Sequence, residues 1–283
     1  RFGNFWKGNM AKKIKILSGW SAPGGSTVAM VNLCNLFNER GYDCTFYGPH
    51  DWHLSKCKAD YLQKCPLNEK DEILIVHYLT LPQRPDASDK VILACHEKDV
   101  YPIAEQKKFW DKVVYVSESQ KEWQSKRETS PVPKLTLGEV IPNVLPDLHP
   151  STNMILQVAG VIGSIDANKK THRSIERALK DGYKDILLYG MITEEDYFTK
   201  FVKPLIDDNP GVKHLSFCDN KQQMYDSVSK VYHSSASETY NYVKAECNLT
   251  GTIYDGLDSA ESGAEVWTNT KILKAWEKLL NLS

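Results

Sequence analysis

The sequence alternates short, continuous apolar runs with segments of helical periodicity, and it does so twice along the chain. The apolar runs lie at 13–17, 43–48, 72–79, 90–97 and 112–118, and then again at 154–163, 185–190 and 212–217. Continuous apolar strands that alternate with helices are typical of a parallel β-sheet covered on both faces. The predicted fold class is therefore α/β with parallel sheets.

A proline-rich segment separates the two halves. Residues 130–152 contain five prolines, a density that indicates a domain boundary and a hinge. We expect two Rossmann-like domains of similar size, at 10–147 and 148–283, facing across a ligand-binding cleft. The last helix, in TNTKILKAWEKLL (268–280), closes the chain, and its packing back on the first domain is left open. Residues 1–9 precede a natural-looking start at Met10 and do not enter the fold prediction.

Bulk composition limits the function classes. The 283 residues are 41% hydrophobic and 25% charged, as in a globular protein with a real core. A net charge of −1 gives no electrostatic case for nucleic-acid binding, and peripheral membrane association is not indicated. The seven cysteines are scattered and lack C-x-x-C spacing, which predicts reduced thiols and a cytoplasmic location. No apolar run reaches the ~18 residues of a spanning helix.

The segment KVYHSSASETYNYVKAE, residues 230–246, has the order of a buried strand, a loop and a helix start. A helix that begins near Tyr240 would leave Glu238 on the loop and Glu246 about 12 Å further along. Free backbone N–H groups at such a helix start suit an anionic phosphate ligand. The spacing suits a long ligand held at two points, although a solvated helix face is the alternative explanation of the two glutamates.

Further candidates follow strands in the first half. Gly24-Gly25 lies between the first strand and a helix at 27–40, where small residues let a backbone approach a ligand. It is not the G-x-G-x-x-G fingerprint, and a tight turn explains it equally well. His96 and Ser117-Glu118 fall at strand ends, beyond which parallel sheets bind ligands. A structural role is the alternative for His96.

Six short segments follow one another in a specific order. They are SAPGGST (21–27), ACHEKD (94–99), YVSESQKEW (115–123), VIPNV (140–144), GSIDANKK (163–170) and ETYNYVKAE (238–246). Their order and spacing resemble a retaining glycosyltransferase of the two-domain GT-B fold, of the family 4 (group 1) type. The resemblance implies transfer of a sugar from a UDP- or GDP-sugar to a hydroxyl acceptor, which is a glycan, a lipid-linked acceptor or another alcohol. It implies that the domain at 10–147 is the acceptor-side domain and that the domain at 148–283 binds the nucleotide sugar, with no obligatory cofactor and no metal.

The resemblance also implies roles for individual residues. His96 would lie near the reacting sugar, Lys169 would neutralise the departing diphosphate, and Glu238 would bind hydroxyls of the donor sugar. Glu246 would bind the ribose hydroxyls. Fixed N–H groups and a lysine stabilise the charge that develops on a leaving diphosphate. The phosphates would rest on the backbone N–H groups of Gly24, Gly25, Thr239, Tyr240 and Asn241.

The chain departs from the family pattern at two places. Ser164 stands where the family has an arginine after the glycine, so Lys170 or Arg173 would have to replace its positive charge. Lys170 would supply a point charge, and Arg173 would supply a guanidinium group that can make two parallel hydrogen bonds. The usual Gly-Phe-Gly is replaced by residues 239–241, Thr-Tyr-Asn, which would narrow the sugar pocket. Trp20 and the stretch 48–53 are the candidates to face the acceptor, with loop anchoring as the alternative.

Three other functions stay open at this stage. A glycosyltransferase of the same fold that modifies phage or viral DNA bases would have nucleic acid as its acceptor and would need a basic groove. A nucleotide-sugar-binding protein without turnover is compatible with the missing arginine. A nucleotide-sugar epimerase on the same scaffold would need further acid–base side chains, which the sequence does not identify.

Overall fold

The structure is a computed structural model that describes residues 12–96, 109–126, 138–151, 157–257 and 265–282. The expected start at Met10, residues 97–99 of the segment 94–99, the first two prolines of the proline-rich segment, and residues 154–156 of the expected strand at 154–163 lie outside these residues. The chain divides into two compact units. Unit 1 comprises Arg1–Val144 and Trp267–Ser283, and unit 2 comprises Leu145–Val266.

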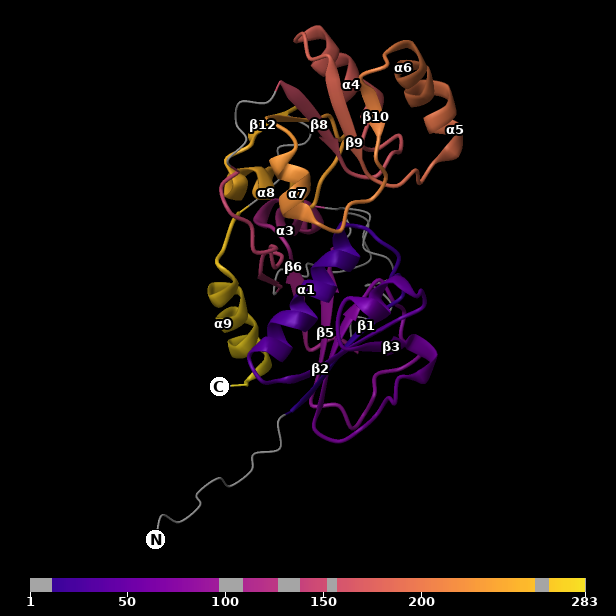
Figure 1. The fold of residues 1–283 in the computed structure, drawn as a ribbon. Helices are drawn as coiled ribbons and strands as arrows, with labels where there is room; N and C mark the ends of the chain where they lie inside the picture. The colour runs from indigo at the N-terminus through magenta and orange to yellow at the C-terminus, as the bar shows by residue number, and fades with distance from the viewer. Residues whose placement is uncertain (1–11, 97–108, 127–137, 152–156, 258–264, 283) are drawn as a thin grey trace. The chain divides into compact units, whose positions relative to one another are not determined.

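Within the described residues of unit 1, seven strands form one parallel sheet in the order β3-β2-β1-β4-β5-β6-β7 (Figure 1). The strands are β1 (Lys13–Ser18), β2 (Asp43–Gly48), β3 (Ala59–Tyr61), β4 (Glu72–His77), β5 (Lys90–Cys95), β6 (Lys112–Tyr115) and β7 (Glu139–Val140). The helices include α1 (Gly25–Glu39), α3 (Glu118–Ser125) and α9 (Asn269–Leu280), with short 3₁₀ turns η1 (Trp52–Ser55) and η2 (Leu62–Lys64).

The central strands of unit 1 are buried along almost their whole length. Every residue of β4 is buried, and only the first residue of β1 is exposed. The helix α1 supplies the matching apolar face, with Ala29, Leu33, Leu36 and Phe37 all buried as their helical spacing predicts. This confirms the predicted α/β class, because strands buried on both faces read as continuous apolar runs.

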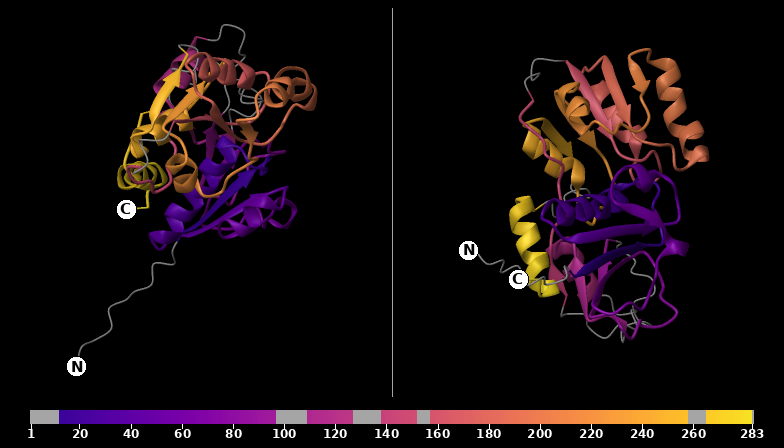
Figure 2. Two further views of the ribbon diagram at one scale, coloured as in Figure 1. Left: turned by 45° about the horizontal axis from the view of Figure 1, so that its top comes forward. Right: turned by 60° about the horizontal axis from the view of Figure 1, so that its bottom comes forward.

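The last helix belongs to unit 1 although it follows unit 2 in the sequence. In α9 the ring of Trp276 packs edge-on against Phe37 of α1, at 6.3 Å between ring centroids. The helix end is also fixed by polar contacts, since Lys90 Nζ donates to the backbone oxygen of Leu279 at 2.7 Å and the Tyr42 hydroxyl donates to Glu277 at 2.8 Å. Both Figure 1 and Figure 2 show α9 beside α1.

Unit 2 has a parallel sheet whose strands lie in the order β10-β9-β8-β11-β12 within the described residues. The strands are β8 (Val158–Ile162), β9 (Asp185–Tyr189), β10 (Val212–His214), β11 (Lys230–His233) and β12 (Ile253–Gly256). The helices are α4 (Thr171–Lys180), α5 (Glu195–Tyr197), a π-helical turn η4 (Phe198–Val202), α6 (Lys203–Asp208), α7 (Lys221–Asp226) and α8 (Tyr242–Thr250).

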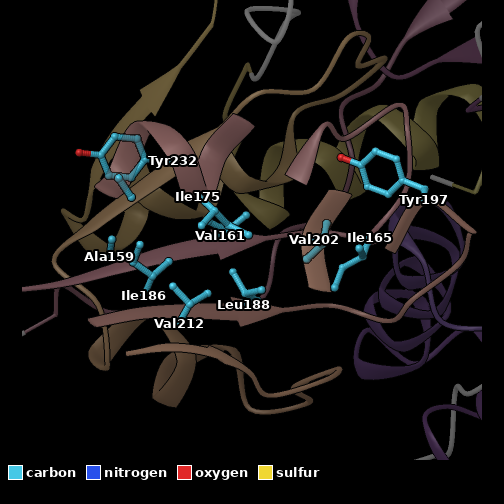
Figure 3. Close-up of a cluster of buried hydrophobic side chains, with 11 residues drawn as sticks. Ala159, Val161, Ile165, Ile175, Ile186, Leu188, Tyr197, Val202, Val212 and Tyr232 are labelled. Atoms are coloured by element: carbon cyan, nitrogen blue, oxygen red, sulfur yellow. The ribbon is translucent and has the colours of Figure 1, made fainter. Parts of the chain in front are cut away.

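Alternate residues of these strands enter two separate cores. On one face Val161, Ile186 and Leu188 meet Ile175 of α4 (Figure 3). On the other face neighbouring strand residues such as Val231 meet side chains of α7 and α8. The sheet is therefore covered on both faces, as predicted.

The state of the cysteines and the character of the helices bear on two further predictions. All seven cysteines carry free thiols. Among the described residues, no helix combines the length and the apolar character needed to cross a membrane.

The packing of α9 gives a stability prediction for unit 1. Replacing the buried Trp276 with alanine removes its contact with Phe37 and leaves a cavity, so we expect the free energy of unfolding to fall by about 3–5 kcal/mol. The exposed Lys274 on the same helix is the matched control, and Lys274→Ala should change that free energy by less than about 0.5 kcal/mol. Urea unfolding measures both; equal effects of the two variants would contradict the assignment of α9 to the core of unit 1.

Candidate functional site in unit 2

The strand order of unit 2 creates a topological switch point between β8 and β11. These strands are neighbours, with Ala159 opposite Lys230 and Gly160 opposite Val231. The helix that follows β8 is α4, whose Ile175 enters one core, whereas α8 after β11 sends Val243 into the core on the opposite face. The loops after the two strands therefore diverge, and open α/β sheets bind ligands at such a point beyond the strands' carboxyl ends.

The turn after β8 is held by the carboxylate of Asp166. Asp166 accepts hydrogen bonds from the backbone N–H of Lys169 at 2.8 Å and from the Ser164 hydroxyl at 2.5 Å. Gly163 opens the turn with a φ of +135°, a region that favours glycine. The turn also contacts the loop after β11, because the backbone N–H of Ala236 donates to the backbone oxygen of Asn168 at 2.7 Å.

One carboxylate oxygen of Glu238, on the loop after β11, is contacted both by Lys169 of the turn after β8 and by His233 at the end of β11. Lys169 Nζ lies 2.5 Å from Glu238 Oε1, and His233 Nε2 lies 2.9 Å from the same oxygen. The side chains of His233 and Glu238 are only 4% and 10% exposed, and that of Lys169 is 24% exposed. An ionised carboxylate only accepts hydrogen bonds, so His233 carries its hydrogen on Nε2. We call these residues the Glu238 cluster.

The Glu238 cluster keeps a buried carboxyl group ionised. Burial by itself would raise the pKa of Glu238, but the hydrogen bond from His233 and the positive charge of Lys169 outweigh it and lower the pKa to about 2. The fall from the ordinary value of 4.5 corresponds to about 3 kcal/mol in favour of the charged form. At neutral pH the site therefore presents a fixed carboxylate that can accept hydrogen bonds from hydroxyl groups.

Glu246 lies on a buried helix face. The helix α8 begins at Tyr242, two residues after the predicted start, so Glu246 is about one turn inside it. Its side chain is almost fully buried, accepting a hydrogen bond from the Tyr225 hydroxyl at 2.7 Å and pairing with Lys221 Nζ at 3.3 Å, both at Oε2. The alternative of a solvated helix face does not hold for this residue.

The loop between the two glutamates carries larger side chains than the family pattern. Tyr240 is 5% exposed, and its hydroxyl donates to the backbone oxygen of Glu265 at 3.3 Å. The Asn241 side chain caps α8 by accepting from the backbone N–H of Lys244 at 2.9 Å. Its amide also donates to the Tyr254 hydroxyl at 2.7 Å. Binding of phosphate by the backbone N–H groups of residues 239–241 stays a prediction.

The predicted substitutes for the missing arginine lie at the start of α4. Lys170 is the N-cap residue, with a left-handed φ of +49°, and Arg173 is exposed in the first turn. Among the residues that the structure describes, neither makes an ion pair, whereas Arg177 one turn further on pairs with Asp255. Ser164 contributes no charge, and its hydroxyl already donates a hydrogen bond to Asp166. Cation supply to a diphosphate by Lys170 or Arg173 stays a prediction.

Three predicted site residues belong to unit 1. The His96 ring, 8% exposed at the end of β5, packs edge-on against His77 at 5.1 Å between centroids. Gly25 begins α1, and Gly24 precedes it with an extended φ of 177°. A Cβ on Gly24 would meet only the Ala22 backbone oxygen at 4.0 Å, so local space does not demand a glycine there. Both interpretations of Gly24-Gly25 stay open.

Within the described part of the chain, no set of three or more His, Cys, Asp or Glu side chains is placed to hold a metal ion.

Several solved structures share this fold over nearly the whole chain. Anabaena HepE, crystallised with UDP and glucose, is 14% identical with a TM-score of 0.68, over 95% of this chain and 90% of its own. The pneumococcal O-GlcNAc transferase GtfA, crystallised with UDP and GlcNAc, is 8% identical with a TM-score of 0.69, over 96% and 99%. AviGT4, a glycosyltransferase involved in avilamycin A biosynthesis, is 13% identical with a TM-score of 0.63, over 95% and 97%.

The chain therefore has an α/β fold with parallel sheets that matches the structures of GT-B glycosyltransferases. No protein-family model and no curated protein sequence matches it.

His233 was not among the site residues predicted from the sequence, which placed it only in a buried strand. Its signal was a histidine directly after the apolar residues Val231 and Tyr232 at a strand end, five positions before Glu238. A polar side chain at that point faces the carboxyl edge of a parallel sheet, where ligands bind.

The lowered pKa of Glu238 predicts a pH-dependent stability. A carboxyl group whose pKa is lower in the folded state stabilises the protein above its unfolded pKa, and this contribution is lost as the pH falls toward the folded pKa. Relative to Glu238→Gln, the wild type should lose about 3 kcal/mol of unfolding free energy between about pH 5 and pH 2. Urea unfolding across this range measures the difference; a difference that does not change with pH would contradict the ionised cluster.

The hydrogen bond from His233 predicts a change in the same pKa. His233→Leu leaves Glu238 buried with Lys169 alone, so the pKa of Glu238 should rise above its value of about 2. His233→Gln keeps an N–H donor and should restore a low pKa. Carbon-13 NMR titration of the glutamate side chains measures the pKa of Glu238. The control is His214→Leu, which removes a histidine that is hydrogen-bonded to the Gly190 backbone oxygen. An unchanged pKa in His233→Leu would remove His233 from the site.

Proposed function

We propose that this protein is a retaining glycosyltransferase of the family 4 type that transfers a sugar from a UDP-sugar to a hydroxyl acceptor. The observation that carries the proposal is the Glu238 cluster, in which a partly buried lysine and a buried carboxylate meet at the switch point of unit 2. The fold is shared with proteins named as glycosyltransferases, such as AviGT4. Fold alone does not fix function, so the argument depends on the chemistry of the site.

The Glu238 carboxylate suits recognition of the donor sugar. Because Lys169 and His233 both hold Oε1, the orientation of the carboxylate is fixed, and a sugar hydroxyl can donate to its other oxygen. Buried and ionised, it binds hydroxyls more strongly than a solvated carboxylate would. Glu238 is thus proposed to position the donor sugar.

Lys169 suits the departing diphosphate. As the bond from the anomeric carbon to the diphosphate breaks, negative charge grows on the leaving group and positive charge on the sugar. A lysine already fixed in the site stabilises that negative charge without reorganising during the reaction. Lys170, Arg173 and the start of α8 would add to it, and Glu246 would accept hydrogen bonds from the ribose hydroxyls. No cofactor is required for this proposal.

The donor base is proposed to be uracil. The structures of HepE include complexes with UDP and with UDP-glucose, and GtfA was crystallised with UDP. Unit 1 is proposed as the acceptor-side domain and unit 2 as the donor-side domain. The role of His96 near the reacting sugar stays a prediction, as does retention by attack on the same face as the leaving group. Seven free cysteines support a cytoplasmic location.

A second candidate is nucleotide-sugar binding without turnover. It is favoured by Ser164 in place of an arginine and by the direct pairing of Lys169 with Glu238, which leaves less free positive charge for the diphosphate. The two functions share a donor site and differ in whether nucleoside diphosphate is released.

A donor panel separates the two candidates. The protein is incubated with UDP-, GDP- and ADP-sugars, and both the thermal shift and the release of nucleoside diphosphate are followed with and without added acceptors. Binding raises the melting temperature by mass action. We expect a shift and UDP release with UDP-sugars; a shift without release under every condition supports the binding protein, and no shift with any nucleotide sugar contradicts both.

Two substitutions test the site itself. Lys169→Ala removes the proposed charge for the diphosphate and Glu238→Ala removes the proposed sugar contact, and we expect each to lower kcat by about 100- to 1,000-fold. Far-UV circular dichroism should show an intact fold. The control is Lys203→Ala on α6, which removes an exposed lysine paired with Asp207 and should leave turnover unchanged. Wild-type rates in both site variants would show that the site is assigned wrongly.

A further inference from the structure

Unit 1 has a topological switch point of its own. Its strand order places β1 beside β4, and Ser18 at the end of β1 lies opposite His77 at the end of β4. The chain reaches β2 from β1 through α1 and goes outward from β4 to β5, so the sheet grows in opposite directions from this pair. A crevice beyond these two strand ends is the expected ligand position in such a sheet. Figure 1 labels β1 of this pair in the first unit.

Large aromatic rings are exposed directly after both strands. Trp20 follows β1 and is 46% exposed, and Tyr78 follows β4 and is 57% exposed. The Trp20 ring packs edge-on against His50, in the turn after β2, at 4.7 Å between centroids. These rings lie at the carboxyl edge that also carries His96, whose strand β5 is paired with β4.

The backbone under these rings is fixed by hydrogen bonds. Ser18 Oγ lies 2.8 Å from His77 Nδ1 and also donates to the backbone oxygen of Trp20. The backbone N–H of Gly19 donates to the backbone oxygen of His77 at 3.0 Å. The two turns approach so closely that a Cβ on Gly19 would come within 2.0 Å of the Tyr78 backbone oxygen. The backbone positions of the two rings are thus fixed by the fold, which lowers the ordering that ligand binding requires.

Tyr78 has an unfavourable backbone conformation. Its φ is +47°, in the left-handed region where bulky residues are uncommon. Such strain is unfavourable and persists where the surrounding structure imposes it, often at ligand sites. A glycine would relieve the strain, yet the position holds an aromatic ring that is mostly exposed.

The segments that directly follow β1, β2 and β4 carry few charges, and Arg84, further along the last of these loops, pairs with Asp111 directly before β6. Residues 18–26, 48–53 and 77–83 contain no lysine or arginine, and Asp51 is their only acidic residue. A nucleic acid or an anionic membrane surface needs lysines and arginines against its phosphates. A neutral sugar instead presents an apolar C–H face, which packs on an aromatic ring, and hydroxyls, which bind polar side chains such as His50 beside Trp20.

We propose that Trp20 and Tyr78 form a binding surface for a neutral carbohydrate, which is the acceptor of the transfer. This inference depends on the proposed function and narrows the acceptor from any hydroxyl compound to an uncharged sugar chain. Trp20 and Tyr78 are assigned to binding and not to the chemical step.

The test uses the full chain, a glycan array of neutral oligosaccharides and a single-stranded DNA oligonucleotide, all in the presence of saturating UDP. We expect the wild type to bind a subset of the glycans and not the DNA. Trp20→Ala and Tyr78→Gly should each weaken this binding about tenfold or more, and Tyr78→Gly does so while relieving backbone strain. Trp20→Phe and Tyr78→Phe keep a ring and should retain most of the binding.

Leu67→Ala is the matched control. Leu67 is an apolar side chain of unit 1 that is about as exposed as Trp20, at 45%. It lies in the segment that contacts the opposite, amino edge of the sheet. The variant should bind glycans like the wild type. The inference is overturned if no glycan binds, if only the DNA binds, or if Trp20→Ala and Tyr78→Gly bind like Leu67→Ala. The thermal shift with UDP keeps the two proposals apart: a UDP shift without glycan binding removes only the acceptor surface, and no UDP shift removes the proposed function.

Discussion

Parallel strand pairing is the constraint on which the rest of this structure depends. It sends the carboxyl ends of all strands to one edge of each sheet, and at a switch point the following helices leave toward opposite faces. In unit 2 this brings together Lys169 and Glu238, which are 69 positions apart in the sequence, at 2.5 Å. In unit 1 the same geometry places Trp20 and Tyr78 on adjacent turns.

The two switch points have opposite surface chemistry. In unit 2 the groups are charged and largely buried, and pairing with Lys169 and His233 outweighs the cost of burying a carboxylate. In unit 1 the groups are aromatic and exposed, and the surrounding residues 18–26, 48–53 and 77–83 include no lysine or arginine. A nucleoside-diphosphate sugar needs fixed charges, whereas a neutral sugar chain needs apolar rings and a polar rim. The two surfaces thus suit a donor and an acceptor of different chemistry.

Much of the fold could be predicted from the sequence because the central strands are continuous apolar runs. The run at 72–79 is the fully buried β4, and the helical spacing of Ala29, Leu33 and Phe37 matches the buried face of α1. The predicted strand ends were less accurate. The strand predicted at 112–118 is β6, which covers only Lys112–Tyr115. It ends early because Ser117 caps α3 by accepting a hydrogen bond from the backbone N–H of Gln120. Local hydrogen bonds of this kind decide where an element ends.

The sequence by itself determined the α/β class, the repeated strand–loop–helix order, and the positions of Lys169 and Glu238 on loops after strands. Only the tertiary structure decided that His233 shares Glu238 Oε1 with Lys169, that Glu246 is buried against Tyr225, and that α9 packs with unit 1. Periodicity reports which side of an element is apolar, since that depends on near neighbours. It carries no information on which distant side chain will meet that element, because such contacts form only when the sheets assemble.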